Sequence, residues 1–486
     1  METGERLREV EREIAARRPE HAISPTLDRI AMLTGLLGDP QRACPVIHVT
    51  GTNGKTSMTR MIDALLRERG LRTGRFTSPH LVSMRERIAI DGQPIGAERF
   101  TGLYEEILPY VRLTDEKQPV PLSFFEVLTG MAFAAFADAP VDVAVIEVGL
   151  GGSWDATNVA DGMVAVVGPV AMDHMNYLGD TLEEIAGEKA GIIKAGAVAI
   201  LAQQPVPAAE VLMRRVAEAG ASVAREGIEF GVIGRELAVG GQQLTLRGLR
   251  GTYDEVFLPL FGAYQAGNAV CSLAAVEAFA GVGGGADPLA GADGLAAPGG
   301  AVLDPALVRD AFAKISSPGR LEVLRRSPTV IADAAHNPAG MAATVEALLE
   351  SFSLTRLVGV LAVSEDKDVA GLLEELEPVL SDIVVTRNSS ARSMAPERLA
   401  EIAAEIFGED RTRAADRLDD AIEIAVAIAD EPSGDDLPGG SGVLITGSVI
   451  TAGDARLLLA PGVPADAPEP PAGTPARHSF TVGDLS

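Results

Sequence analysis

The chain has 486 residues and a formal net charge of −27. This length exceeds what one hydrophobic core usually serves, so two domains of about 150 to 300 residues are expected. The acidic balance argues against nucleic acid as a partner, because neutralising phosphates requires a basic face, and no apolar run is long enough to span a bilayer.

The N-terminal segment METGERLREVEREI is charged and amphipathic. It lacks the apolar stretch of a signal peptide, which predicts a cytoplasmic location. The two cysteines, Cys44 and Cys271, show no pairing pattern, as is usual in a reducing compartment. A first helix is expected to about Arg18 and a second one to about Gly38.

A β-branched run ending at Val49 precedes the sequence GTNGKTS, and apolar residues at helical spacing follow over 58–70. This order predicts a buried parallel strand, a tight glycine loop and a helix. A helix N-terminus offers partial positive charge and unpaired N–H groups to a phosphate, and Lys55 adds a full charge. The hydroxyl of Thr56 could bind Mg²⁺. The strict P-loop pattern has glycine where Val49 stands, so this is a shortened variant, and an ordinary strand-to-helix turn is the alternative.

The sequence TSPHL follows the next expected strand. Pro79 ends that strand and leaves the Ser78 hydroxyl and the His80 imidazole at its end. Open α/β sheets bind ligands at such positions. The apolar helical stretch 124–136 is expected to belong mostly to the core, with a substrate contact as the alternative for any one of its aromatic residues.

An apolar strand over 141–149 carries Glu147 near its end. A carboxylate is costly there unless it meets a cation, and an acid in this place downstream of a P-loop typically holds Mg²⁺. A salt-bridged strand end is the alternative. A further strand over 163–170 precedes Asp173 and His174, and a neutral imidazole suits a metal, although a lone histidine is more often structural.

Only 6 of the 41 basic residues are lysines. Two of them, Lys189 and Lys194, fall in an expected helix over 182–194. Glycines on either side of Lys189 indicate close packing, whereas a solvated surface helix is the alternative.

Residues 281–304 are rich in glycine and contain no basic residue, which predicts a flexible insertion. The first domain is therefore expected to comprise residues 1–316. Apolar runs then alternate with helical stretches over 317–460, which predicts a second, smaller α/β domain with a mainly parallel sheet. Segments 430–441 and 461–486 are rich in proline and glycine and are expected to be mobile, the second as a disordered tail.

Ten motifs follow one another along nearly the whole chain: TLDRI, TGTNGKTS, TSPHL, FEVLT, EVGLGG-x-WDATN, DH-x-x-YLG-x-T, EKAGI, PGR, DAAHNP and ITGSV. In this series the chain resembles the folylpolyglutamate synthase and dihydrofolate synthase family of Mur-type ligases. The resemblance implies a P-loop-containing ATPase domain followed by a Rossmann-like domain. It also implies an ATP-dependent ligase, expected as a monomer, that adds L-glutamate to a folate or to dihydropteroate through an acyl phosphate.

The resemblance assigns the ATP phosphates to the loop residues Gly51, Thr52, Asn53, Gly54, Lys55, Thr56 and Ser57. It assigns further nucleotide contacts to Asn268, Arg320 and Asp333. It assigns Mg²⁺ to Ser78, Glu147 and His174. Lys189 matches the lysine that CO₂ carbamylates in this family. Carbamylation turns the cation into a carboxylate-like ligand, and arginine cannot undergo this reaction.

The catalytic residues that the resemblance implies are Lys55, Lys189, His336 and Asp333. Lys55 would neutralise charge in the transition state, and the other pair, His336 and Asp333, would position glutamate or the second domain. Substrate contacts are expected from Pro79, His80, Phe125, Ser153 and Trp154. The family commonly has arginine where Ser153 stands, so the loss of a guanidinium predicts altered substrate choice or weaker binding.

The sequence leaves other functional classes of protein open. A P-loop kinase or GTPase would share the loop and Glu147 but gives no account of Lys189 or of DAAHNP. A nucleotide-regulated binding protein without turnover would tolerate the loss of Lys189. A Mur-type ligase that joins an amino acid to a UDP-linked cell-wall precursor is the closer alternative, and TSPHL and FEVLT favour folate over it.

Overall fold

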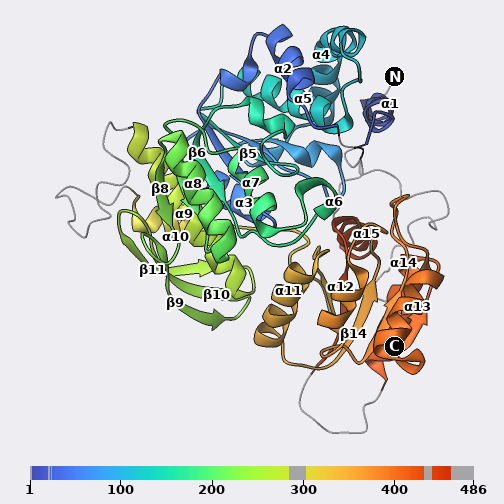
Figure 1. The fold of residues 1–486 in the computed structure, drawn as a ribbon. Coiled ribbons are helices and arrows are strands. Elements are labelled where there is room, and N and C mark those ends of the chain that lie inside the picture. The colour runs from blue at the N-terminus through green and yellow to red at the C-terminus, as the bar shows by residue number, and fades with distance from the viewer. Residues whose placement is uncertain (1–2, 20–21, 23, 284–302, 432–439, 461–486) are drawn as a thin grey trace. The chain divides into compact units, whose positions relative to one another are not determined.

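The computed structural model describes residues 3–19, 22, 24–283, 303–431 and 440–460 (Figure 1). The predicted tail 461–486 and most of the predicted mobile segments 281–304 and 430–441 lie outside the described residues. By its internal contacts the chain divides into two units. Unit 1 comprises Met1–His80, Met84–Glu322 and Asn337–Ser353, and unit 2 comprises Leu81–Ser83, Val323–His336 and Leu354–Ser486.

Unit 1 is built on an eight-stranded sheet of order β4-β3-β2-β5-β1-β6-β7-β8. The strands are β1 (Val46–Thr50), β2 (Thr73–Phe76), β3 (Ile88–Ile90), β4 (Gln93–Pro94), β5 (Val143–Glu147), β6 (Gly162–Val167), β7 (Val198–Leu201) and β8 (Ser222–Arg225). The central strand β1 pairs in parallel with β5 and β6. The carboxyl ends of these three strands therefore lie at one edge, where open α/β sheets bind ligands.

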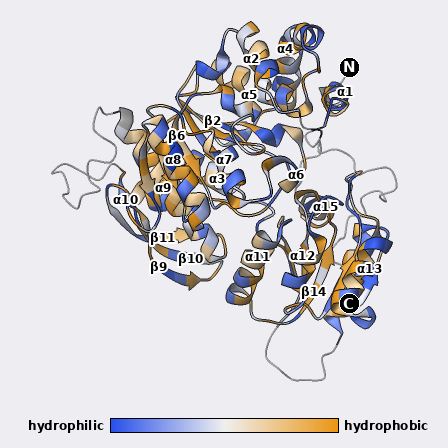
Figure 2. Ribbon diagram, viewed as in Figure 1, coloured by the Kyte–Doolittle hydropathy of each residue, from blue (hydrophilic) through white to orange (hydrophobic). Residues whose placement is uncertain are grey.

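Helices cover both faces of this sheet. Side chains alternate along a strand, so Ile47 and Val49 of β1 join one apolar cluster with α3 and α9, whereas Val46 joins another with α1, α4 and α5. Figure 2 colours the helices and strands by hydropathy. The helices of unit 1 are α1 (Thr3–Ala15), α2 (Asp28–Leu36), α3 (Lys55–Glu68), α4 (Ala97–Lys117), α5 (Phe124–Asp138), α6 (Met175–Leu178), α7 (Leu182–Ala190), α8 (Val206–Ala219), α9 (Ala263–Gly283), α10 (Pro305–Ala313) and α11 (Pro338–Ser351).

Some sequence expectations for unit 1 were wrong in detail. Helix α7 ends at Ala190, so Lys194 lies beyond it and donates to the carbonyls of Asn158 (2.7 Å) and Ala160 (2.6 Å). The first helix ends at Ala15 and the strand β6 at Val167. A second sheet of order β11-β10-β9 was not expected. Its strands are β9 (Gly231–Ala238), β10 (Gly241–Arg247) and β11 (Thr252–Leu258).

Unit 2 contains a six-stranded sheet of order β12-β13-β17-β14-β15-β16. Its strands are β12 (Glu322–Arg326), β13 (Thr329–Ala332), β14 (Leu354–Leu361), β15 (Asp382–Val385), β16 (Thr412–Ala414) and β17 (Gly440–Thr446). The five neighbouring strands β13, β17, β14, β15 and β16 pair in parallel. This confirms the expected mainly parallel sheet. The helices are α12 (Val369–Leu376), α13 (Pro396–Phe407), α14 (Leu418–Asp430) and α15 (Val449–Leu459).

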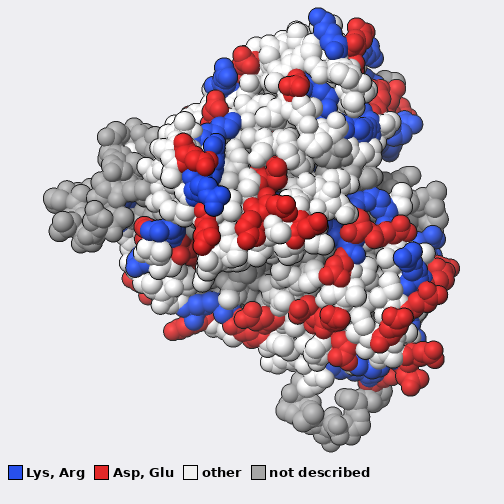
Figure 3. Space-filling model, viewed as in Figure 1, with Lys and Arg blue, Asp and Glu red and all other residues white. Residues whose placement is uncertain are grey.

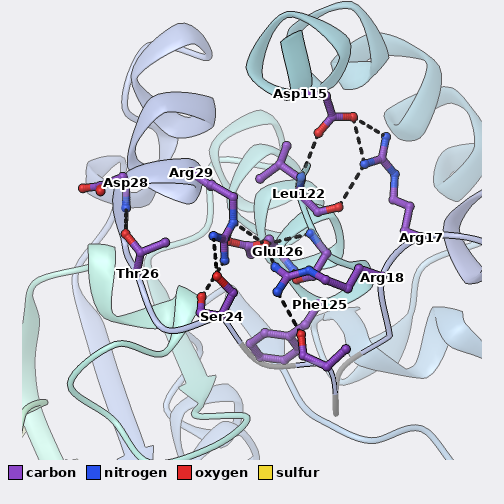
Figure 4. A network of polar contacts seen from close by, with 12 residues as sticks. Arg17, Arg18, Ser24, Thr26, Asp28, Arg29, Asp115, Leu122, Phe125 and Glu126 are labelled. Carbon is purple, nitrogen blue, oxygen red and sulfur yellow. Dashed lines mark hydrogen bonds and ion pairs between the residues drawn. The ribbon is translucent and has the colours of Figure 1, made fainter. Parts of the chain in front are cut away.

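A buried ion pair joins α2 to the start of α5 (Figure 4). Arg29 Nε donates to Glu126 Oε1 at 2.9 Å, and the two residues are 5% and 4% exposed. The Glu126 carboxylate also accepts from the Ser123 N–H at 2.7 Å, while the Ser123 hydroxyl accepts from the Glu126 N–H at 3.2 Å. This capping box satisfies two donors at the start of the helix. The motifs TLDRI and FEVLT are therefore held together by one carboxylate.

We expect Arg29→Met to lower the free energy of unfolding by about 3 kcal/mol, because it leaves the Glu126 carboxylate buried without its main cation. Among the described residues, the ion pair left to Glu126 would be the longer contact with Arg18, at 3.5 Å. Urea denaturation measures the loss. The control is Arg6→Met, which removes an exposed ion pair with Glu105 and should change stability far less. Equal losses in the two variants would contradict the importance of burial.

Candidate active site

The turn between β1 and α3 has the geometry of a phosphate-binding loop. Helix α3 begins at Lys55, directly after Gly54, which has a φ of +83°. A Cβ at Gly54 would lie 2.4 Å from Asn268 Oδ1 of α9, so both the backbone conformation and the close approach require glycine. The predicted nucleotide residue Asn268 therefore lies against the loop. Ser57 is also buried, with its hydroxyl 3.1 Å from that of Ser317.

Two lysines meet at one carbonyl of this loop. Lys55 Nζ donates to Gly51 O at 2.9 Å and to Thr52 O at 3.1 Å, and Lys189 Nζ donates to the same Gly51 O at 3.0 Å. Burial, reinforced by the positive charge of Lys55, lowers the pKa of Lys189 to about 7. Lys189 is thus a buried lysine whose amine loses its proton near physiological pH.

Glu147 ends β5 beside the loop and is 1% exposed. Its Oε1 accepts from the Thr56 hydroxyl at 2.7 Å, and its Oε2 accepts from the Ser78 N–H at 3.3 Å. Burial raises the pKa of Glu147, although the charges of Lys55 and Arg320 oppose this shift. A cation beside this carboxylate would offset its cost of burial, so the group fits a metal ion.

A small cavity opens between these elements. It is lined by Thr50, Gly51, Thr52, Lys55, Val148, Gly149, Leu150, Gly151, Asp173, His174, Leu178 and Lys189. His174 has a φ of +52°, and its N–H donates to the Asp173 carboxylate at 2.8 Å. In the described part of the chain, no three His, Cys, Asp or Glu side chains form a group that could hold a metal. The predicted Mg²⁺ set uses only Glu147 and His174 of these types, so a hydroxyl and a modified lysine would have to complete it.

The expected substrate residues occupy different environments. Pro79 is exposed, and His80 Nδ1 accepts from Arg87 Nε at 2.9 Å. Burial lowers the pKa of His80 to about 3, so its ring is neutral. Phe125 packs on Phe76, with ring centroids 5.7 Å apart.

Ser153 and Trp154 belong to the glycine loop, residues 149–158, and Phe125 lies against it. A Cβ at Gly149 would lie 2.6 Å from Phe125 Cζ. The Ser153 hydroxyl donates to Glu188 O at 3.1 Å, and Trp154 is partly buried in the cluster that includes Ile185. These three residues therefore gather at one loop beside the cavity.

Asp333 and His336 lie in unit 2, between β13 and the start of α11. Asp333 Oδ1 accepts from the Ala335 N–H at 2.8 Å, and His336 Nδ1 lies 2.9 Å from Ala334 O. These local bonds shape the turn after β13. Their assignment to catalysis stays a prediction.

His48, Asp155 and Thr157 are among the buried polar residues that sequence reasoning left without a role. His48 stands in the middle of a buried strand, where a polar side chain needs a partner. The position of His48 in a buried strand was therefore the sequence signal that could have indicated a role for it. The partner, Thr157, is 109 positions away, so no local pattern could identify it.

Residues 319–449 match the family model described as Mur ligase, glutamate ligase domain. This match, together with the P-loop geometry of unit 1, places the chain in the class of ATP-dependent ligases of the Mur type.

Comparison with curated relatives identifies the family within this class. The chain is 50% identical over 471 residues to the dihydrofolate synthase/folylpolyglutamate synthase of Mycobacterium tuberculosis, covering 93% of this chain and 94% of the relative. It is 34% identical over 364 residues to the Bacillus subtilis protein of the same name, covering 74% and 81%. The chain belongs to the dihydrofolate synthase/folylpolyglutamate synthase family.

Solved structures agree with this assignment. The Mycobacterium tuberculosis folylpolyglutamate synthase complexed with ADP and AMPPCP gives a TM-score of 0.86 at 49% identity, covering 94% of this chain and 99% of that one. An Escherichia coli structure in complex with DHPP and ADP gives 0.73 at 29% identity, covering 90% and 93%. The predicted fold class and family are confirmed, and the kinase and cell-wall alternatives lose their support. Among the described residues, no helix is both long and apolar enough to cross a membrane.

Proposed function

We propose that the enzyme joins L-glutamate to the carboxylate of a reduced folate and also to that of dihydropteroate, with hydrolysis of ATP to ADP and phosphate. The convergence of Lys55 and Lys189 on Gly51 O, beside the buried carboxylate of Glu147, carries this proposal. Such a site gathers the charges that phosphoryl transfer requires. The names of the relatives from Mycobacterium tuberculosis and Bacillus subtilis, which combine both activities, support the two substrates.

The reaction has two steps. A carboxylate oxygen of the folate attacks the γ-phosphorus of ATP, the bond to ADP breaks, and an acyl phosphate forms. The amine of L-glutamate then attacks the acyl carbon, phosphate leaves, and the nitrogen loses a proton to give the amide. Lys55 neutralises the charge that develops on the phosphoryl oxygens. Asn268, Arg320 and Asp333 hold the nucleotide in this proposal.

We assign Mg²⁺ to Ser78, Glu147, His174 and a carbamylated Lys189. The neutral Lys189 amine adds to CO₂ and loses a proton, which gives an anionic oxygen ligand in place of a cation. When bound, Mg²⁺ supplies positive charge to the phosphate oxygens. The catalytic pair Asp333 and His336 positions glutamate, and the residues that contact the folate are Pro79, His80, Phe125, Ser153 and Trp154.

We further propose that the enzyme is a cytoplasmic monomer with domains at 1–316 and 317–460. Both cysteines are free, as suits a reducing compartment. On the visible face, acidic side chains lie among the basic ones (Figure 3), which does not favour nucleic acid as a partner.

The test measures phosphate release that depends on ATP, L-glutamate and Mg²⁺, with dihydropteroate and with a reduced folate in parallel. Saturable turnover with both is expected. Turnover with the reduced folate alone would remove the dihydrofolate synthase activity, and turnover with neither would contradict the proposed function.

A further inference from the structure

One face of β1 is polar at two positions, although the strand is fully buried. Val46, His48 and Thr50 share this face because side chains alternate along a strand. The Thr50 hydroxyl donates to Gly151 O at 2.8 Å, and His48 Nε2 lies 2.9 Å from Thr157 Oγ1. Both polar residues therefore hold the glycine loop, residues 149–158. The same strand continues directly into the phosphate-binding loop.

The direction of the hydrogen bonds follows from the number of hydrogens available. The Thr157 hydroxyl has one hydrogen, which it donates to Asp155 Oδ1 at 2.5 Å. The nitrogen that faces it, His48 Nε2, must therefore carry a hydrogen and donate to Thr157 Oγ1. Burial lowers the pKa of His48 to about 3, so the ring is neutral and Nδ1 is bare. Within the described residues this buried Nδ1 has no hydrogen-bond partner.

The chain of hydrogen bonds ends on backbone of the cavity wall. Asp155 is 4% exposed, and besides the hydroxyl it accepts from the Thr157 N–H at 2.9 Å and from the Leu150 N–H at 2.9 Å. Leu150 precedes Gly151, the residue that Thr50 holds. Gly149, Leu150 and Gly151 line the cavity that also receives Lys55 and Lys189.

We propose that His48 is a positioning residue of the ligase reaction: through Thr157 and Asp155 it fixes the wall 149–151 relative to the phosphate-binding loop. This inference rests on the proposed function. A histidine with one unsatisfied nitrogen is a poor choice for packing alone, because an apolar residue of similar size would avoid that penalty. The histidine serves here as a neutral donor of fixed direction.

The test compares His48→Gln with His48→Met. Glutamine places an amide N–H near the position of Nε2, whereas methionine fills similar volume without a donor. We expect His48→Met to lower kcat about tenfold, because small displacements of reacting groups are expensive. The KM for ATP should stay within about twofold of wild type, because a residue that only positions reacting groups acts on the transition state more than on substrate binding. His48→Gln should recover most of the rate.

Thr157→Val and Thr157→Ser form a second matched pair, which keeps the test valid if His48→Met does not fold. The valine variant removes the hydroxyl and should lose a similar factor in kcat, while serine keeps it. The double variant His48→Met/Thr157→Val should be no slower than the slower single variant, because both changes break the same chain of hydrogen bonds. Thermal unfolding of each variant verifies that the protein is folded at the assay temperature.

A wild-type kcat in folded His48→Met or Thr157→Val, equal rates for the glutamine and methionine variants, or multiplicative losses in the double variant would each overturn the inference. Wild-type protein without turnover would contradict the proposed function instead. In that event amide hydrogen exchange still decides the role of His48, since the Leu150 amide should exchange faster in His48→Met than in His48→Gln. Equal exchange would overturn the inference.

Discussion

Replacing Lys55 with methionine should lower kcat for phosphate release by about 10²- to 10³-fold, the loss typical of one preorganised group that stabilises developing charge. The side chain begins α3 and reaches back to the carbonyls of Gly51 and Thr52. Its ammonium group is therefore already in place at the helix N-terminus, where phosphate oxygens bind best. The measurement is continuous phosphate release at saturating substrates.

Lys314→Met is the matched control for this prediction. Lys314 pairs with Glu68 at 3.1 Å, and its side chain is 64% exposed, so its removal should leave kcat near the wild-type value. If both variants kept wild-type turnover, the phosphate would have to bind elsewhere than at the loop after β1.

Lys189→Arg should be nearly as damaging, with kcat reduced by about 10²-fold or more. Arginine keeps a positive charge, but it cannot become an anionic carbamate. In wild-type protein the rate should fall in CO₂-depleted buffer and recover with bicarbonate. The variant should show no response to bicarbonate, and wild-type protein given isotopically labelled bicarbonate should show a carbamate signal that the variant lacks.

The pH dependence of this effect has a definite sign. The pKa of Lys189 is lowered to about 7, so the neutral amine rises from about one tenth at pH 6 to about nine tenths at pH 8. Activation by bicarbonate should therefore increase over this interval. Activation that is flat over it, or a Lys189→Arg variant that still responds to bicarbonate, would contradict carbamylation.

Local signals in the sequence predicted the elements around the site well. The β-branched run before the glycine loop became β1, and the periodic stretch after it became α3. Glu147 does end a buried strand. The antiparallel sheet β9–β11 was missed, because its strands are only half buried and mix polar residues and glycine with apolar ones. The end of α7 was missed because helix boundaries are weakly marked in sequence.

The amino-acid sequence by itself predicted the phosphate-binding loop and the residue types available at the end of each strand, because these depend on neighbours along the chain. The class of ligase came from the resemblance of its motifs to those of a known family. Only the tertiary structure decided that Lys55 and Lys189 share one carbonyl, that burial lowers the pKa of Lys189 to about 7, and that His48 reaches Asp155 through Thr157. The physical reason is that a pKa and a hydrogen-bond partner are set by burial and by groups distant in sequence, which come together only when the sheet assembles.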